Sequence, residues 1–202
     1  MIIDTIMRTA PVIPVLVIDD VANARPIAEA LVRGGLTVLE VTLRTPAALD
    51  VIAEMAKVDG AIVGAGTVLN TADFEASVAA GAQFIVSPGL TESLGKAAIS
   101  SGMPFLPGIA NAGDIMRGMD LGLTSFKFFP ATASGGLPAL RALAAPFMAA
   151  KFCPTGGITE ATAGEWLAEP SVLCVGGSWI VAKGTVDLAA IETKARAASG
   201  LR

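Results

Sequence analysis

The sequence predicts an α/β fold, a (β/α)8 or TIM barrel, in which residues 1–202 form a single domain. Eight short runs of apolar and β-branched residues recur along the chain. Each run is followed by a turn-forming break and then by an Ala/Leu/Glu-rich stretch with helical spacing. The runs begin 20 to 26 residues apart, which is close to the lower limit for a barrel of eight units, about 25 residues each.

The eight expected strands are apolar at nearly every position, and most of them end in small or turn-forming residues. Runs of this kind that alternate with helices are typical of a parallel sheet covered by helices. The expected strands are residues 12–18, 38–44, 62–68, 84–89, 105–110, 125–130, 151–157 and 172–178.

The expected helices fill the gaps between these strands, and several begin with a capping hydroxyl. Thr45 precedes Pro46, which suits the first position of a helix, and Thr71 and Thr159 open two further helices. The expected helices are residues 20–33, 46–58, 71–80, 91–101, 111–121, 136–149, 159–168 and 187–198. A doubly wound sheet also alternates strands and helices, but it needs about six strands and a G-x-G-x-x-G loop, which the sequence lacks.

The composition excludes several kinds of chemistry. The chain has no histidine, so a Ser-His-Asp relay, an imidazole base and a His-ligated zinc site are all excluded. We expect no metal and no organic cofactor. A net charge of −4 argues against a nucleic-acid partner. No apolar stretch has the length of a membrane span, and two cysteines without a signal peptide favour the cytoplasm.

The second expected strand places polar side chains where a barrel is normally apolar. Glu40, Thr42 and Arg44 alternate with apolar residues and therefore share one face, the interior and its mouth. Glu40 is the only one of 18 acidic residues inside an expected strand. Because a buried unpaired ion costs several kcal/mol, this placement indicates a function. The alternative is a mutual ion pair of Glu40 and Arg44 at the barrel mouth.

The sixth expected strand carries a lysine among phenylalanines. Alternation places Ser125, Lys127 and Phe129 on one face and Phe126 and Phe128 on the other. A Schiff-base nucleophile must be a neutral amine, and an apolar environment near a cation such as Arg44 favours that form. The alternative is a lysine that extends from the strand end into solvent.

Two glycine-rich turns follow the last two strands. Thr155-Gly156-Gly157 ends the seventh strand and Gly176-Gly177-Ser178 ends the eighth. Loops at these positions of such barrels often bind phosphate through backbone N–H groups and a helix N-terminus. Either pair alone is also consistent with a simple tight turn.

Together, an interior lysine, one interior carboxylate, one arginine and a phosphate loop suit a Schiff-base aldolase or decarboxylase acting on a phosphorylated keto acid. The lysine condenses with a 2-keto group, and the resulting imine withdraws electrons from the neighbouring bond. The carboxylate moves the proton, directly or through water. The arginine holds a substrate carboxylate by a bidentate pair.

Six segments, in order along the chain, resemble the 2-keto-3-deoxy-6-phosphogluconate (KDPG) aldolase family of the Entner-Doudoroff pathway, which overlaps with the 4-hydroxy-2-oxoglutarate (KHG) aldolases. These segments are VLEVTLRT (38–45), VGAGTVLN (63–70), SPGLT (87–91), FKFFPA (126–131), FCPTGGI (152–158) and VGGSW (175–179). The resemblance implies reversible cleavage of KDPG to pyruvate and glyceraldehyde 3-phosphate by a homotrimer.

The resemblance also implies roles for individual residues. Lys127 would form the Schiff base and Glu40 would be the acid and base. The substrate would be bound by residues at the ends of several strands. Arg44 and Thr67 would bind the carboxylate derived from pyruvate, with Pro88 and Phe129 lining that pocket, Thr155 contacting the substrate chain, and Gly156, Gly157, Gly177 and Ser178 binding the phosphate.

Other functions remain open from the sequence. The nearest is a keto-acid aldolase for 4-hydroxy-2-oxoglutarate or the phosphogalactonate epimer, although Thr155 and the Thr42-Leu43-Arg44 triplet resemble the gluconate enzymes. A phosphate-binding isomerase or epimerase could use Glu40 as its base. A catalytically silent barrel could serve as an oligomeric scaffold.

Overall fold

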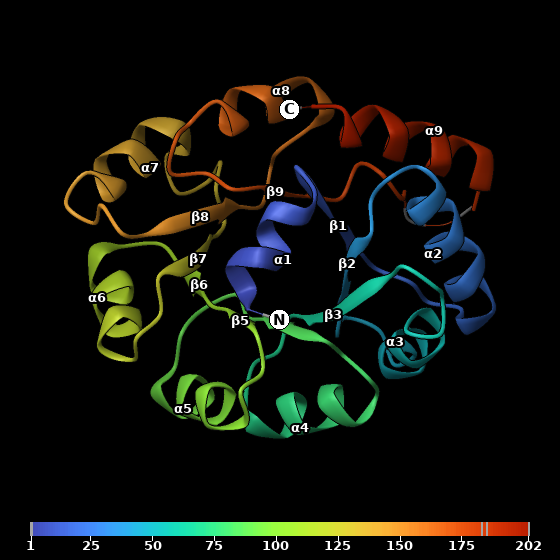
Figure 1. Ribbon diagram of the computed structural model, residues 1–202, viewed down its shortest axis with the longest axis horizontal. Coiled ribbons are helices and arrows are strands. Elements are labelled where there is room, and N and C mark those ends of the chain that lie inside the picture. The colour runs from blue at the N-terminus through green and yellow to red at the C-terminus, as the bar shows by residue number, and fades with distance from the viewer. Residues whose placement is uncertain (1, 183, 185, 202) are drawn as a thin grey trace.

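The computed structural model describes residues 2–182, 184 and 186–201 and places parallel strands inside a ring of helices (Figure 1). The strands are β1 (Val12–Leu16), β2 (Val38–Thr42), β3 (Ile62–Gly66), β4 (Phe84–Val86), β5 (Phe105–Leu106), β6 (Gly108–Ile109), β7 (Ser125–Phe128), β8 (Lys151–Pro154) and β9 (Val175–Gly177). The longer helices are α2 (Ala24–Arg33), α3 (Ala48–Met55), α4 (Thr71–Ala79), α5 (Glu92–Ser101), α6 (Ala112–Asp120), α7 (Gly136–Ala144), α8 (Glu160–Leu167) and α9 (Leu188–Ser199).

The strands pair into two parallel sheets. The first has six strands in the order β5-β4-β3-β2-β1-β9, and the second has three in the order β6-β7-β8. The α/β class and the parallel pairing of the expected strands are confirmed. A closed barrel has one continuous ladder of paired strands. In this structure the ladder is interrupted at two places.

The first division lies within the expected strand 105–110, which forms β5 and β6 on either side of Pro107. β5 pairs with β4, and β6 pairs with β7. Pro107 has no N–H to donate to a ladder, although its carbonyl accepts from the N–H of Lys127 at 2.8 Å. The second division lies between β8 and β9, which are joined by isolated bridges from Phe152 to Val172 and from Thr155 to Gly176.

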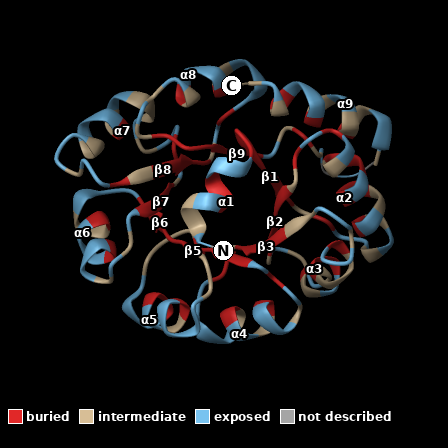
Figure 2. Cartoon of the chain, viewed as in Figure 1, coloured by how far each residue is buried: buried red, intermediate tan, exposed pale blue. Residues whose placement is uncertain are grey.

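The core has two parts. One lies between the strands and the outer helices and includes Leu39, Val41, Phe126 and Phe128. The other lies inside the curled sheets and contains side chains from β1, β2, β4, β5 and β8, together with Ile6, Met7, Leu173 and Cys174. Figure 2 shows buried residues along the strands and on the inner sides of the helices, with exposed residues outside.

Ile6 and Met7 belong to α1 (Ile3–Thr9), a helix that the sequence pattern did not predict. Figure 1 shows α1 across the centre of the molecule, at the end from which the strands start. Both residues are fully buried, so α1 closes the amino-terminal end of the interior. Side chains that carry chemistry can therefore be reached only from the opposite end, where the strands finish.

Most of the expected strands and several expected helices are a few residues shorter in the structure, and two of these differences have a clear cause. The helix expected over 136–149 ends at Ala144, because Pro146, two residues on, has no N–H with which to continue the helical hydrogen bonds. The strand expected over 172–178 begins at Val175, where its pairing with Val12 of β1 begins. Within the described residues, no helix is both long and apolar enough to span a membrane.

Candidate active site

Glu40 lies on β2 with its side chain directed into the interior, as the alternation predicted. Its neighbours Leu39 and Val41 pack on the helix side, so alternation along the strand sends the carboxylate the other way. Only 4% of the Glu40 side chain is exposed. On the same face, the Thr42 hydroxyl donates to the carbonyl of Leu16 at 2.9 Å, which ties β2 to β1 below the mouth.

Lys127 enters the same interior from β7, on the other sheet. Its side chain is 7% exposed, and its Nζ donates to Oε1 of Glu40 at 2.9 Å. A buried amine and a buried carboxylate thus satisfy one another at the end of the interior away from α1. The alternatives of a solvent-extended lysine and of a mutual Glu40–Arg44 ion pair are both wrong for this structure.

The apolar surroundings expected for Lys127 are only partly present. Phe126 and Phe128 face the helices, where they pack against Phe152 and Trp166 with ring centroids 6.3 and 6.4 Å apart. Phe129 is the aromatic ring beside the amine, with its centroid 5.5 Å from Nζ. Alternation explains the difference, because neighbours in the sequence of a strand point to opposite faces.

Arg44 and Thr67 come together at the mouth. The Nε of Arg44 donates to the Thr67 hydroxyl at 3.3 Å, and Arg44 is exposed to solvent. Thr67 has a φ of +60°, a left-handed conformation that β-branched residues rarely adopt. Strained backbone of this kind concentrates at functional sites. The guanidinium offers its remaining donors to an anion.

A cavity of about 100 Å³ opens at the carboxyl ends of the strands. It contains six of the nine residues predicted to bind substrate: Arg44, Phe129, Thr155, Gly156, Gly157 and Ser178. The ring of Phe129 connects this cavity to Lys127.

The backbone of the turn after β8 requires glycine. Gly156 and Gly157 have φ values of +102° and +78°, which residues with a Cβ rarely adopt. A Cβ on Gly157 would lie 2.5 Å from the Thr132 hydroxyl oxygen. Successive backbone N–H groups in such a turn can surround an anion.

Five of the eleven predicted site residues do not line this cavity: Lys127, Glu40, Thr67, Pro88 and Gly177. Pro88 packs against β6, where its carbonyl oxygen would be 2.1 Å from a Cβ on Gly108. Gly177 is buried beneath the ring of Trp179, whose Cζ3 would lie 1.8 Å from a Cβ there. In this part of the chain, Gly176 of β9 and Ser178 directly after β9 line the cavity instead.

Sequence reasoning missed three lining residues, Val15, Ile158 and Gly176. Val15 could have been found from alternation along β1, because Ile13 faces the interior cluster. Gly176 could have been found from its position in the Gly-Gly turn. Ile158 carries no chemical signal of its own.

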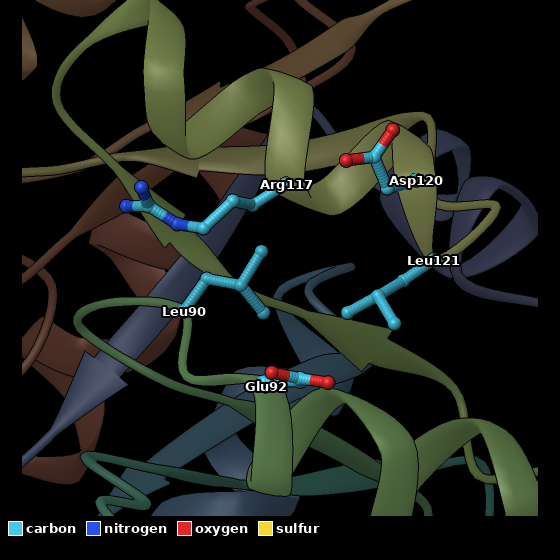
Figure 3. Close-up of a pocket in the computed structure, with 5 residues that line it drawn as sticks. All are labelled: Leu90, Glu92, Arg117, Asp120 and Leu121. Atoms are coloured by element: carbon cyan, nitrogen blue, oxygen red, sulfur yellow. The ribbon is translucent and has the colours of Figure 1, made fainter.

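A separate pocket lies between α5 and α6, at some remove from the Lys127–Glu40 pair. Figure 3 shows its lining residues, Leu90, Glu92, Arg117, Asp120 and Leu121. None of the predicted site residues belongs to it. Across the described part of the chain, no three Cys, Asp or Glu side chains gather as metal ligands.

Comparisons with known proteins show the family to which the chain is similar. The family model for KDPG and KHG aldolases matches residues 3–194. A 2-dehydro-3-deoxy-phosphogluconate aldolase from Zymomonas mobilis is 58% identical over 200 residues, which cover 99% of this chain and 96% of the relative.

Solved structures of KDPG aldolases are also similar to this chain. A crystal structure of the Zymomonas mobilis 2-keto-3-deoxy-6-phosphogluconate aldolase with 3-phosphoglycerate is 58% identical, has a TM-score of 0.98 and covers 99% of this chain and 96% of its own. The KDPG aldolase of Legionella pneumophila, with pyruvate captured as a covalent carbinolamine, has a TM-score of 0.96 and 43% identity, and covers 99% of both chains.

Proposed function

The chain belongs to the KDPG and KHG aldolase family, and we propose that it cleaves 2-keto-3-deoxy-6-phosphogluconate reversibly to pyruvate and glyceraldehyde 3-phosphate. It is a lyase of the Schiff-base class, acting without a metal or organic cofactor in the Entner-Doudoroff pathway. The observation that carries the mechanism is the buried contact of 2.9 Å between Lys127 Nζ and Glu40 Oε1, next to Phe129, whose ring lines the cavity.

The first step joins Lys127 to the substrate. The ammonium passes a proton to Glu40 or to water, and the neutral Nζ attacks the C2 carbonyl to give a carbinolamine. That proton is returned to the carbinolamine hydroxyl, which leaves as water and gives a protonated imine, with Glu40 again a carboxylate. The imine accepts the electron pair of the bond to be broken. The Legionella pneumophila relative with captured pyruvate supports this assignment.

The second step breaks the bond between C3 and C4. Glu40, as carboxylate, takes the proton of the C4 hydroxyl, the aldehyde leaves, and the electron pair of the broken bond forms an enamine on Lys127. Glu40 then returns its proton to C3 of the enamine. Hydrolysis of the imine releases pyruvate and regenerates the amine.

The remaining residues orient the substrate. Arg44 and Thr67 bind the C1 carboxylate, Pro88 and Phe129 border the pyruvate portion, and Thr155 contacts the chain beyond C3. Gly156, Gly157, Gly177 and Ser178 bind the phosphate at the far end. The accessible Arg44 guanidinium and the positive-φ turn at Gly156 support these roles.

The assembly belongs to the same proposal. The two sheets complete a closed (β/α)8 barrel within one domain, supported by the bridges between β8 and β9 and by the continuous chain through Pro107. The protein acts in the cytoplasm as a homotrimer, as the family resemblance implies. Light scattering on the purified chain tests this, since a trimer has three times the chain mass.

A coupled assay tests the activity. Pyruvate release is followed with lactate dehydrogenase on KDPG, its galactonate epimer and 4-hydroxy-2-oxoglutarate. We expect the highest kcat/KM on KDPG. A higher value on 4-hydroxy-2-oxoglutarate would assign the chain to the other activity in the family's description, and no pyruvate from any of the three would contradict the proposal.

A further inference from the structure

Two glycines on the inner face of β3 lie beside Glu40. In the pairing of β2 with β3, Glu40 is opposite Gly64 and Thr42 is opposite Gly66. Neither glycine has a positive φ, so the backbone conformation does not require glycine at these positions. Their lack of a side chain must be explained by what occupies the space.

The carboxylate of Glu40 occupies the space over Gly66. A Cβ added to Gly66 would lie 2.2 Å from Oε1 of Glu40, 2.7 Å from its Cγ and 2.8 Å from its Cδ. All three distances are shorter than real Cβ contacts allow. The side chain of Glu40 therefore leans two residues along the strand from its own partner, toward the end where the cavity opens.

A phenylalanine ring occupies the space over Gly64. A Cβ there would lie 2.4 Å from Cζ of Phe84, which is fully buried in the interior cluster. The ring fills the space over Gly64, so a Cβ there would press on the ring and not on the carboxylate. Oε1 of Glu40, the atom nearest to a Cβ on Gly66, is also the acceptor from Lys127.

We propose that Gly66 is a positioning residue for the proton transfers, because only a residue without a Cβ lets the Glu40 carboxylate lie where it reaches Lys127 and the reacting carbon. This inference rests on the proposed function, in which Glu40 moves protons at C3. A Cβ at this position displaces the carboxylate from that place. Lys127 comes from the opposite sheet, and the three heavy atoms nearest to a Cβ on Gly66 all belong to Glu40, so we expect the amine to keep its capacity to condense with pyruvate.

The test separates condensation from proton transfer. Condensation is measured as the rate at which borohydride traps pyruvate on Lys127. Proton transfer is measured by NMR as the exchange of pyruvate methyl hydrogens for deuterium, which requires removal of a proton from the imine. We expect Gly66→Ala to lower the exchange rate about 10-fold or more relative to the trapping rate, the scale of a mispositioned acid or base.

Gly64→Ala is the matched control, since it lies on the same strand and face and presses on its neighbour to a similar extent. Its Cβ meets the Phe84 ring instead of a carboxylate. We expect it to lower the urea midpoint as Gly66→Ala does while keeping the ratio of exchange to trapping within about 2-fold of wild type. An equal fall of that ratio in both variants would overturn the inference in favour of general deformation.

A double variant covers the case in which Gly66→Ala alone does not fold. Glu40→Asp shortens the side chain and leaves room for a Cβ, so adding Gly66→Ala to it should change the exchange rate by less than about 2-fold. If Gly66→Ala lowered the exchange rate in the Glu40→Asp background as much as it does in wild type, its effect would not act through the Glu40 side chain. That result would contradict the inference.

Failure of the inference differs from failure of the proposed function. If wild-type protein gives no adduct on Lys127, the proposed function fails. If the adduct forms and exchange depends on Glu40 but not on Gly66, only the inference fails.

Discussion

The amine of Lys127 and the carboxylate of Glu40 meet at 2.9 Å, although they lie 87 residues apart and belong to different sheets. Each is nearly inaccessible to solvent. The contact depends on the curvature that brings β2 and β7 to face one another, and on α1, which closes the other end of the interior. The site is therefore a property of the whole fold.

Replacing the carboxylate by an amide tests its role in moving protons. We expect Glu40→Gln to slow turnover of KDPG by about 10²-fold or more, the usual scale for a positioned acid or base. Pyruvate should still condense with Lys127, because the substitution leaves the amine and Arg44 in place. The coupled assay and borohydride trapping measure the two effects. Turnover close to wild type would mean that water or the substrate phosphate moves the protons.

The buried pair should also be visible in stability. Lys127→Met leaves the Glu40 carboxylate buried without its partner, which is expected to lower the free energy of unfolding by about 3 kcal/mol. The double variant Lys127→Met/Glu40→Gln removes the unpaired charge and should recover most of that loss. Urea denaturation at neutral pH measures both. Equal destabilisation by the single and the double variant would show that the pair is not the cause.

Arg44 should govern the affinity for the carboxylate. Arg44→Lys retains the positive charge but loses the planar fork and the contact to Thr67. We expect the KM for pyruvate in the exchange reaction to rise about 10-fold with little change in kcat. Arg25→Lys is the control, since Arg25 pairs with Glu54 on the outer surface. An unchanged KM in Arg44→Lys would remove this residue from the binding site.

Ser178 should matter only for phosphorylated substrates. Ser178 directly follows β9 and lines the cavity. Loss of one hydrogen bond from its hydroxyl to a charged group is expected to raise the KM for KDPG about 10-fold. The same variant, Ser178→Ala, should leave the KM for 4-hydroxy-2-oxoglutarate unchanged, because that substrate has no phosphate. A parallel rise for both substrates would indicate a structural effect.

Much of the fold and the position of the key side chains could be predicted from the sequence. Period-two alternation placed Glu40 and Lys127 in the interior, because a strand has only two faces. The same rule placed Phe126 and Phe128 on the face opposite to the amine, so it did not support an apolar environment built from all three phenylalanines. The division at Pro107 depends on which neighbour each half of one strand can pair with, and the α/β repeat does not contain that information.

The features that could not be predicted depend mostly on tertiary packing. α1 is seven residues long and has no side-chain N-cap, so only its packing of Ile6 and Met7 against the interior explains it. The role of Gly66 depends on how the side chain of Glu40 leans across β3, which strand spacing does not reveal. The direct contact of Glu40 with Lys127 likewise requires the relative placement of the two sheets.

The central claim is that Lys127 forms a Schiff base with a 2-keto acid. The protein is incubated with pyruvate, reduced with borohydride, digested and analysed by peptide mass spectrometry, with Lys127→Met and a surface variant, Lys96→Met, treated in parallel. We predict one reduced pyruvyl group on the peptide that contains Lys127, in wild type and Lys96→Met alike, and none in Lys127→Met. An unmodified Lys127 in protein that still turns over KDPG would contradict the mechanism.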